Sequence, residues 1–95
     1  MKKQPVVYIL TNRKKGVLYI GVTSDIVVRM ALHISGKGSK FAAKYGLTTL
    51  VHIEYFETML QAIEREKDMK KWKRAWKVEL INLNNPEWRD LKYDL

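Results

Sequence analysis

The chain has 95 residues, which is enough for one hydrophobic core and too short for two. Hydrophobic residues make up 46% and charged residues 29%, proportions of a folded domain that argue against disorder. The lack of cysteine excludes disulfides, zinc–thiolate sites and thiol catalysis. No apolar run approaches the roughly 20 residues of a membrane span or the about 7–15 of a signal-peptide core, so we expect a cytoplasmic protein.

The net charge is +8, and it is unevenly spread along the chain. Residues 1–40 carry eight Lys or Arg and one acid, whereas residues 41–95 carry ten and nine. A second basic stretch, residues 65–77, has seven basic residues and two acids. Such an excess favours a polyanionic partner, meaning nucleic acid or an anionic membrane surface. The alternative is a set of solvated lysines that keep the protein soluble.

The first part of the chain predicts a β-hairpin followed by a helix. Residues 6–10 and 17–22 are β-branched and aromatic, as strands are, and the polar connection ends in Gly16, which favours an antiparallel hairpin. Capping residues at 23–25 precede residues 26–33, whose apolar positions have helical spacing.

The middle of the chain predicts a loop, a short helix and a third strand. Residues 35–40 hold two glycines and two lysines and predict a mobile basic loop. A short helix over residues 41–45 would end at Gly46. Residues 47–56 are rich in Thr, Val, Ile, Tyr and Phe, which is typical of a strand.

The last part predicts helices and a docked tail. Thr58 and Gln61 form a capping-box pattern that opens a helix running to about Arg74, and residues 75–83 either continue it or form a second helix. We expect residues 82–95 to be a short tail that docks on a domain spanning residues 4–81. The fold class is therefore α+β, with a three-stranded, largely antiparallel sheet flanked by helices in the order β-β-α-(α)-β-α-α.

Two tyrosines stand out in the hairpin. A connection of two or four residues would pair Leu10 with Tyr19 and Tyr8 with Gly21, which places both tyrosines on one face; an odd length would separate them. Gly21 opposite Tyr8 would leave open space in which a ligand could approach. The alternative is two ordinary strand tyrosines packed against a helix.

Polar residues on the two predicted helices form the other candidates. Arg29 and His33 are four residues apart and therefore share one helix face. The guanidinium of an arginine suits phosphate, because it donates two parallel hydrogen bonds to two oxygens. The alternative is an exposed polar face in which Asp25 pairs with Arg29. Glu66 lies among basic residues. It either pairs with Lys70 on the helix surface or binds Mg²⁺, which often takes one or two protein carboxylates.

Taken in order, these residues resemble the signature of the GIY-YIG nuclease superfamily. The second triplet, Tyr19-Ile20-Gly21, is intact, whereas the first is Val6-Val7-Tyr8 in place of Gly-Ile-Tyr. The resemblance continues through Arg29, His33, the Gly-Lys-Gly-Ser-Lys loop and the segment 62–67, and covers about residues 4–81. It is greatest to the small stand-alone bacterial members.

The resemblance implies hydrolysis of phosphodiester bonds in DNA by an endonuclease that needs Mg²⁺ or Mn²⁺. Glu66 matches the acidic metal ligand, Tyr8 the tyrosine that positions or deprotonates water, and Tyr19 and Arg29 groups that act on the phosphate. His33 matches a position that is often polar in the family. Positive charge around Tyr8 would have to lower its pKa if it acts as the base. Backbone contacts are expected from basic side chains in the loop and the long helix: Lys37, Lys40, Lys67, Lys70, Lys71 and Lys73.

Three functional hypotheses therefore stand beside one another. The first is the metal-dependent DNA endonuclease, with DNA repair or processing as its setting and no membrane partner. The second is a nucleic-acid-binding module of the same fold that cleaves little or not at all. The third is a protein-interaction domain whose docking surface consists of Trp72, Trp76, Trp88 and Tyr93. The oligomeric state is not predicted by the sequence.

Overall fold

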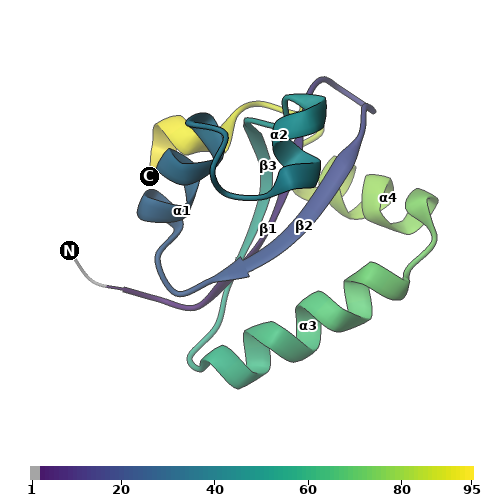
Figure 1. The fold of residues 1–95 in the computed structure, drawn as a ribbon. Coiled ribbons are helices and arrows are strands. Elements are labelled where there is room, and N and C mark those ends of the chain that lie inside the picture. The colour runs from purple at the N-terminus through teal and green to yellow at the C-terminus, as the bar shows by residue number, and fades with distance from the viewer. Residues whose placement is uncertain (1–2) are drawn as a thin grey trace.

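Three antiparallel strands form the centre of the molecule, and helices cover both faces of the sheet (Figure 1). The computed structural model describes residues 3–95. The elements in chain order are β1 (Val6–Thr11), β2 (Leu18–Thr23), α1 (Ile26–Ile34), α2 (Lys40–Tyr45), β3 (Thr49–Tyr55), α3 (Met59–Lys71), α4 (Arg74–Asn84) and a 3₁₀ turn, η1 (Leu91–Asp94). The α+β architecture predicted from the sequence is confirmed.

The sheet has the order β2-β1-β3, and its central strand β1 is buried along its whole length. The hairpin register pairs Tyr8 with Gly21 and Leu10 with Tyr19, which is the register expected from an even connection. Tyr8 and Tyr19 therefore lie on the same face of the sheet.

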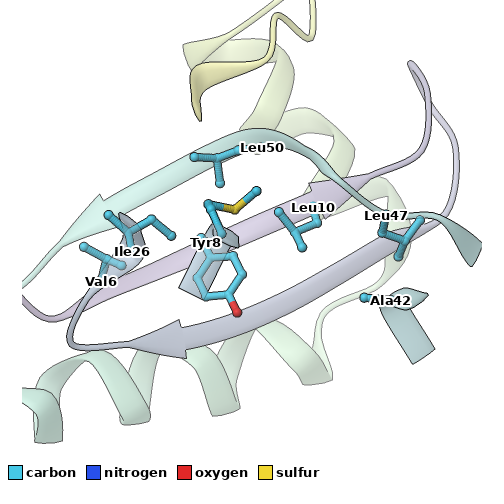
Figure 2. Packing of buried hydrophobic residues seen from close by; sticks show 8 residues of the cluster. Val6, Tyr8, Leu10, Ile26, Ala42, Leu47 and Leu50 are labelled. Atoms are coloured by element: carbon cyan, nitrogen blue, oxygen red, sulfur yellow. The ribbon is translucent and has the colours of Figure 1, made fainter. Parts of the chain in front are cut away.

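The two faces of the sheet carry separate hydrophobic cores. Alternate residues of β1, namely Val6, Tyr8 and Leu10, form the first core together with buried residues of α1, α2 and the segment that leads into β3. Val7 and Ile9 point the other way and pack against α3 and α4. Figure 2 shows the first core, in which the Tyr8 ring extends from β1 across β2, with its hydroxyl directed away from the other side chains.

Local signals in the sequence set most helix ends. The Asp25 side chain accepts a hydrogen bond from the Val28 N–H and caps α1. Gly46, with φ of 65°, ends α2 in the left-handed conformation that favours glycine. The capping box of Thr58 and Gln61 is formed at the start of α3.

One helix ends earlier than the sequence predicted. The helix expected to reach about Arg74 stops at Lys71, because Trp72 and Lys73 adopt extended backbone with ψ of 150° and 146°. Trp72 packs against the α3–α4 side of the sheet, and α4 starts in a new direction behind the sheet (Figure 1). Of the two alternatives for residues 75–83, the second helix is correct.

The C-terminal segment wraps the outer edge of β3. Trp88 belongs to the core beneath α3 and α4, whereas Leu91 packs on the core of the opposite face. Between them, Asp90 Oδ1 accepts a hydrogen bond from the Leu50 N–H of the edge strand, at 3.1 Å. This contact satisfies one backbone N–H on the open edge of the sheet. The domain division at residue 81 stays a prediction. No helix within residues 3–95 is long and apolar enough to cross a membrane.

Candidate active site

The Tyr8 hydroxyl is the centre of a polar cluster on the α1 face of the sheet. His33 Nε2 lies 2.8 Å from it, and Arg29 Nε donates to the same oxygen at 3.4 Å. Arg29 and His33 do share one helix face, but that face points inward, and His33 is only 3% exposed. The alternative of an exposed polar face is therefore wrong, and Asp25 serves as the helix cap.

The loop before α2 is tied to this cluster. Arg29 Nη2 donates to the Gly38 carbonyl at 3.0 Å. A Cβ on Gly38 would overlap the His33 ring, so the close approach of the loop requires glycine. His33 Nδ1 is buried and has no hydrogen-bond partner within residues 3–95. The Gly-Lys-Gly-Ser-Lys loop is thus part of the wall of the site.

Burial disfavours the charged forms of Tyr8 and His33. It raises the pKa of Tyr8 to about 12, although the hydrogen bond from Arg29 opposes the rise. Burial, together with the positive charge of Arg29, lowers the pKa of His33. The surroundings therefore do not lower the pKa of Tyr8, as they would have to if Tyr8 acted as the base on its own.

The hydrogen bond between Tyr8 and His33 allows one direction of proton transfer. When Nε2 of His33 carries no proton, the Tyr8 O–H can donate to it, while the Arg29 N–H donates to the Tyr8 oxygen. This arrangement can pass a proton from Tyr8 to His33 within one short hydrogen bond.

Tyr19 and Gly21 of β2 complete the wall of the cluster. The Tyr19 ring lies 6.3 Å from the Tyr8 ring and 5.5 Å from the His33 ring, centroid to centroid. A Cβ on Gly21 would overlap Cζ and Oη of Tyr8. The open space expected at Gly21 is therefore filled by Tyr8 itself, and it is not a place for a ligand.

Glu66 lies on α3, which packs against β1 and β2 on the face of the sheet opposite α1 (Figure 1), and its side chain is 14% exposed. Its negative charge contributes to the raised pKa of Tyr8, so the carboxylate is within electrostatic range of that hydroxyl. Glu66 Oε2 also forms an ion pair with Lys70 Nζ at 3.2 Å, which is the surface pairing considered as the alternative. The structure shows the pair, and it leaves the role of Glu66 in metal binding as a proposal.

The candidate backbone-binding lysines lie on two exposed segments. Lys37 and Lys40 flank the loop that Arg29 holds, which places them beside the cluster. The other four lie on α3 and at the start of α4: Lys67, Lys70, Lys71 and Lys73. Lys70 is engaged with Glu66, and Lys73 Nζ lies 5.9 Å from the centre of the Trp76 ring.

Sequence reasoning missed two aromatic residues near the cluster. Phe41 of α2 stacks on Tyr19 with centroids 6.4 Å apart, and Tyr45 lies 4.9 Å from Phe41. Their spacing of four residues on a short helix directly after the basic loop was the available signal.

The four aromatic residues of the protein-interaction hypothesis do not form one surface. Trp88 is buried, and its indole N–H donates to Asn82. Trp72 is half-buried beneath the Arg65 guanidinium, whereas Trp76 and Tyr93 are exposed in different grooves. The structure therefore gives this hypothesis no support as it was stated.

Comparison with known proteins agrees with the geometry. The GIY-YIG catalytic domain model matches residues 4–79. A UPF0213 protein of Syntrophus aciditrophicus is 40% identical over 82 residues, covering 85% of this chain and 92% of that protein. The UPF0213 protein OB0043 of Oceanobacillus iheyensis is 31% identical over 87 residues, covering 92% of this chain and 100% of the relative.

A solved structure shows the same fold. The solution NMR structure of the UPF0213 protein BH0048 from Bacillus halodurans aligns with a TM-score of 0.58 and 32% sequence identity, and the alignment covers 92% of each chain. With the family match over most of its length and the tyrosine, arginine and histidine side chains meeting in one cluster, the chain belongs to the GIY-YIG nuclease superfamily, among the small proteins of the UPF0213 type.

Proposed function

We propose that this protein is a divalent-metal-dependent endonuclease that hydrolyses phosphodiester bonds in DNA. The observation that carries the proposal is the meeting of Tyr8, His33 and Arg29 within hydrogen-bond distance, with the charge of Glu66 acting on the same hydroxyl. DNA repair or processing in the cytoplasm is the setting that we propose for this activity.

The donor set fits a hard cation bound through one carboxylate. Within residues 3–95 no three His, Asp or Glu side chains gather into a metal centre, so Glu66 would act alone. Mg²⁺ commonly accepts one or two protein carboxylates and keeps water and phosphate oxygens as its other ligands. When bound, the ion supplies positive charge for the phosphate and leaving oxygens. Lys70 contacts Oε2 of Glu66, so the other carboxylate oxygen would hold the ion.

The residues around Tyr8 can move the proton of the attacking water. As the water oxygen bonds to phosphorus and the P–O bond to the leaving oxygen breaks, the water proton passes to Tyr8 Oη while the Tyr8 proton passes to His33 Nε2, which becomes an imidazolium. The leaving alkoxide takes up a proton from solvent. Tyr8 remains neutral throughout, so its raised pKa does not prevent the reaction. Arg29 is always charged, and it would stabilise the negative charge that grows on the phosphate more than that of the ground state.

Replacing Glu66 with glutamine tests the proposal. Glu66→Gln removes the metal-binding charge and should abolish cleavage with Mg²⁺ or Mn²⁺, while DNA binding stays similar or becomes slightly tighter. Single-turnover cleavage of single-stranded, nicked and branched DNA would be measured beside binding. Glu64→Gln, two residues earlier on the exposed face of α3, is the matched control and should cleave normally.

Two results would contradict the proposal in different ways. Normal cleavage by Glu66→Gln would remove Glu66 from metal binding. If the wild-type protein binds DNA and cleaves no substrate with either metal, the alternative of a nucleic-acid-binding module with this fold is the better description.

A further inference from the structure

An aromatic row leads from the Tyr8 cluster onto the surface. Tyr19 touches the rings of Tyr8 and His33 on one side and stacks on Phe41 on the other, with an angle of 26° between the Tyr19 and Phe41 planes. Phe41 in turn contacts Tyr45. Phe41 is 45% exposed and Tyr45 is 43% exposed, so the outer part of the row is open to solvent. Phe41 is thus one ring away from the proposed reacting groups.

The short helix that carries these rings is firmly anchored. The Ser39 side chain caps its first turn, and Gly46 closes its end. Ala42, which lies between the two aromatic residues in the sequence, is buried, and so is Leu47, directly after the helix. Burial of a small residue under α2 explains how the helix sits close to the sheet. It does not explain why two large aromatic rings remain on the solvent side, which costs hydrophobic free energy.

The charge around the row matches a polyanion. Between Asp25 and Glu54 the sequence contains no acidic residue. The same segment contains Lys37, Lys40 and Lys44, and Lys44 Nζ lies 5.4 Å from the centre of the Tyr45 ring. Exposed aromatic faces combined with lysines and no acids are what single-strand-binding surfaces use, because bases stack on the rings while the cations face the phosphates.

We infer that Phe41 and Tyr45 form a base-stacking platform, so that the strand beside the proposed cleavage site is bound as single-stranded DNA. The inference rests on the proposed function for the position of the reacting phosphate, and it adds the substrate class. Bases paired inside a duplex stack on one another and present only their edges, so they cannot lie on these rings. A single strand, or a frayed end, can place a base on Phe41 while its phosphate reaches Arg29.

Binding measured without cleavage tests the platform. With EDTA present, fluorescence anisotropy gives the dissociation constant for three ligands: an oligothymidylate of about 8 nucleotides, within the site size of small single-strand binders, an abasic oligomer of the same length, and a duplex. The wild-type protein should bind oligothymidylate more tightly than the abasic oligomer. The double variant Phe41→Leu/Tyr45→Leu should bind oligothymidylate roughly 10-fold or more weakly and the other two ligands unchanged.

Two further variants serve as controls. Tyr93→Leu removes an exposed tyrosine that also has a lysine near its ring, at 5.3 Å, but lies beside Ile34 of α1. It should bind all three ligands as the wild type does. Phe41→Trp keeps an aromatic face and should keep the preference for bases. If the double variant is unfolded by circular dichroism, Tyr45→Leu alone decides, because Tyr45 is 43% exposed and lies at the outer end of the row.

Several results would overturn the platform. They are unchanged binding of oligothymidylate by the folded leucine variant and an equal loss of all three ligands. A fourth ligand, oligouridylate, tests the choice of DNA: if it binds more tightly than oligothymidylate in a base-dependent way, the assignment of single-stranded DNA as the substrate class is overturned. Cleavage is assayed separately with Mg²⁺. If the wild type cleaves no DNA but shows base-dependent binding, the proposed function fails and the platform stands; if it cleaves DNA but binds the abasic oligomer equally well, the platform fails alone.

Discussion

Replacing Glu54 with glutamine should destabilise the protein, because this carboxylate joins β3 to α3. Both Arg65 Nε and Nη2 donate to Glu54, at 2.8 and 3.1 Å, and His52 Nε2 lies 2.8 Å from Oε2. Arg65 directly precedes Glu66, so the pair also holds the part of α3 that faces the site. Burial alone would raise the pKa of Glu54, but the hydrogen bonds from His52 and Arg65 outweigh it and lower the pKa to about 2.

The size of the effect follows from that pKa. Lowering the pKa of a carboxyl from its ordinary 4.5 to about 2 corresponds to roughly 3 kcal/mol of folding free energy at neutral pH. The side chain of Glu54 is 21% exposed and that of Arg65 is 33% exposed. Solvent screening therefore reduces the expected loss to about 2 kcal/mol, or roughly 8–16 °C in Tm for a domain of this size.

The pH dependence has a definite sign. Because the folded-state pKa is lowered, the stabilisation is complete above pH 4.5 and is lost as the pH falls through about 2. At pH 3 roughly two fifths of it should remain, so the wild type and Glu54→Gln should approach each other in stability between pH 5 and pH 3.

Urea unfolding followed by tryptophan fluorescence measures this difference. Trp72 is a suitable reporter because the Arg65 guanidinium lies 4.9 Å from the centre of its ring. Glu64→Gln is the control, since Glu64 is exposed and forms no ion pair within the described part of the chain. Equal urea midpoints for wild type and Glu54→Gln at pH 7, or a difference that is the same at pH 7 and pH 3, would refute the reasoning.

Three further predictions concern the site. The cleavage rate should rise with pH and level off below pH 6.5, the ordinary pKa of histidine, because the pKa of His33 is lowered and its neutral form accepts the proton. A rate that still rises above pH 8 would indicate that Tyr8 itself ionises. Gly21→Ala should lower single-turnover cleavage about 100-fold, because its Cβ would displace the Tyr8 hydroxyl, and wild-type rates would show that this contact is harmless. Replacing two exposed lysines of α3 in Lys67→Ala/Lys71→Ala should weaken DNA binding and leave the cleavage rate at saturating DNA unchanged. The slope of the logarithm of the binding constant against the logarithm of salt concentration should fall by about one per lysine. An unchanged slope would mean that neither lysine contacts phosphate.

Much of the fold could be predicted because it depends on local signals. Turn, cap and breaker residues such as Asp25, Gly46 and the Thr58–Gln61 box act within a few residues of their own position, and the elements that they delimit are present. The hairpin was predictable only as a choice between two registers. Once the connection is even, the alternation of side chains puts Tyr8 and Tyr19 on one face without any other contact.

The break after α3 shows the limit of local reasoning. Residues 72–74 have no helix breaker, and a continuous helix through them satisfies local propensity. The helix ends at Lys71 because Trp72 packs on the sheet and α4 must turn to cover the remaining apolar surface. Burial against a distant part of the chain overrides propensity at such positions.

For the candidate site, the sequence by itself determined which reactive side chains exist and which of them share a strand or a helix face. Tertiary structure alone decided that the shared face of Arg29 and His33 points inward to Tyr8, and that burial raises the pKa of Tyr8. It also decided that Phe41 stacks on Tyr19, twenty-two positions earlier in the chain. Periodicity describes an element's own faces, but the packing of whole elements selects which face meets which, and the pKa values follow from the burial that results.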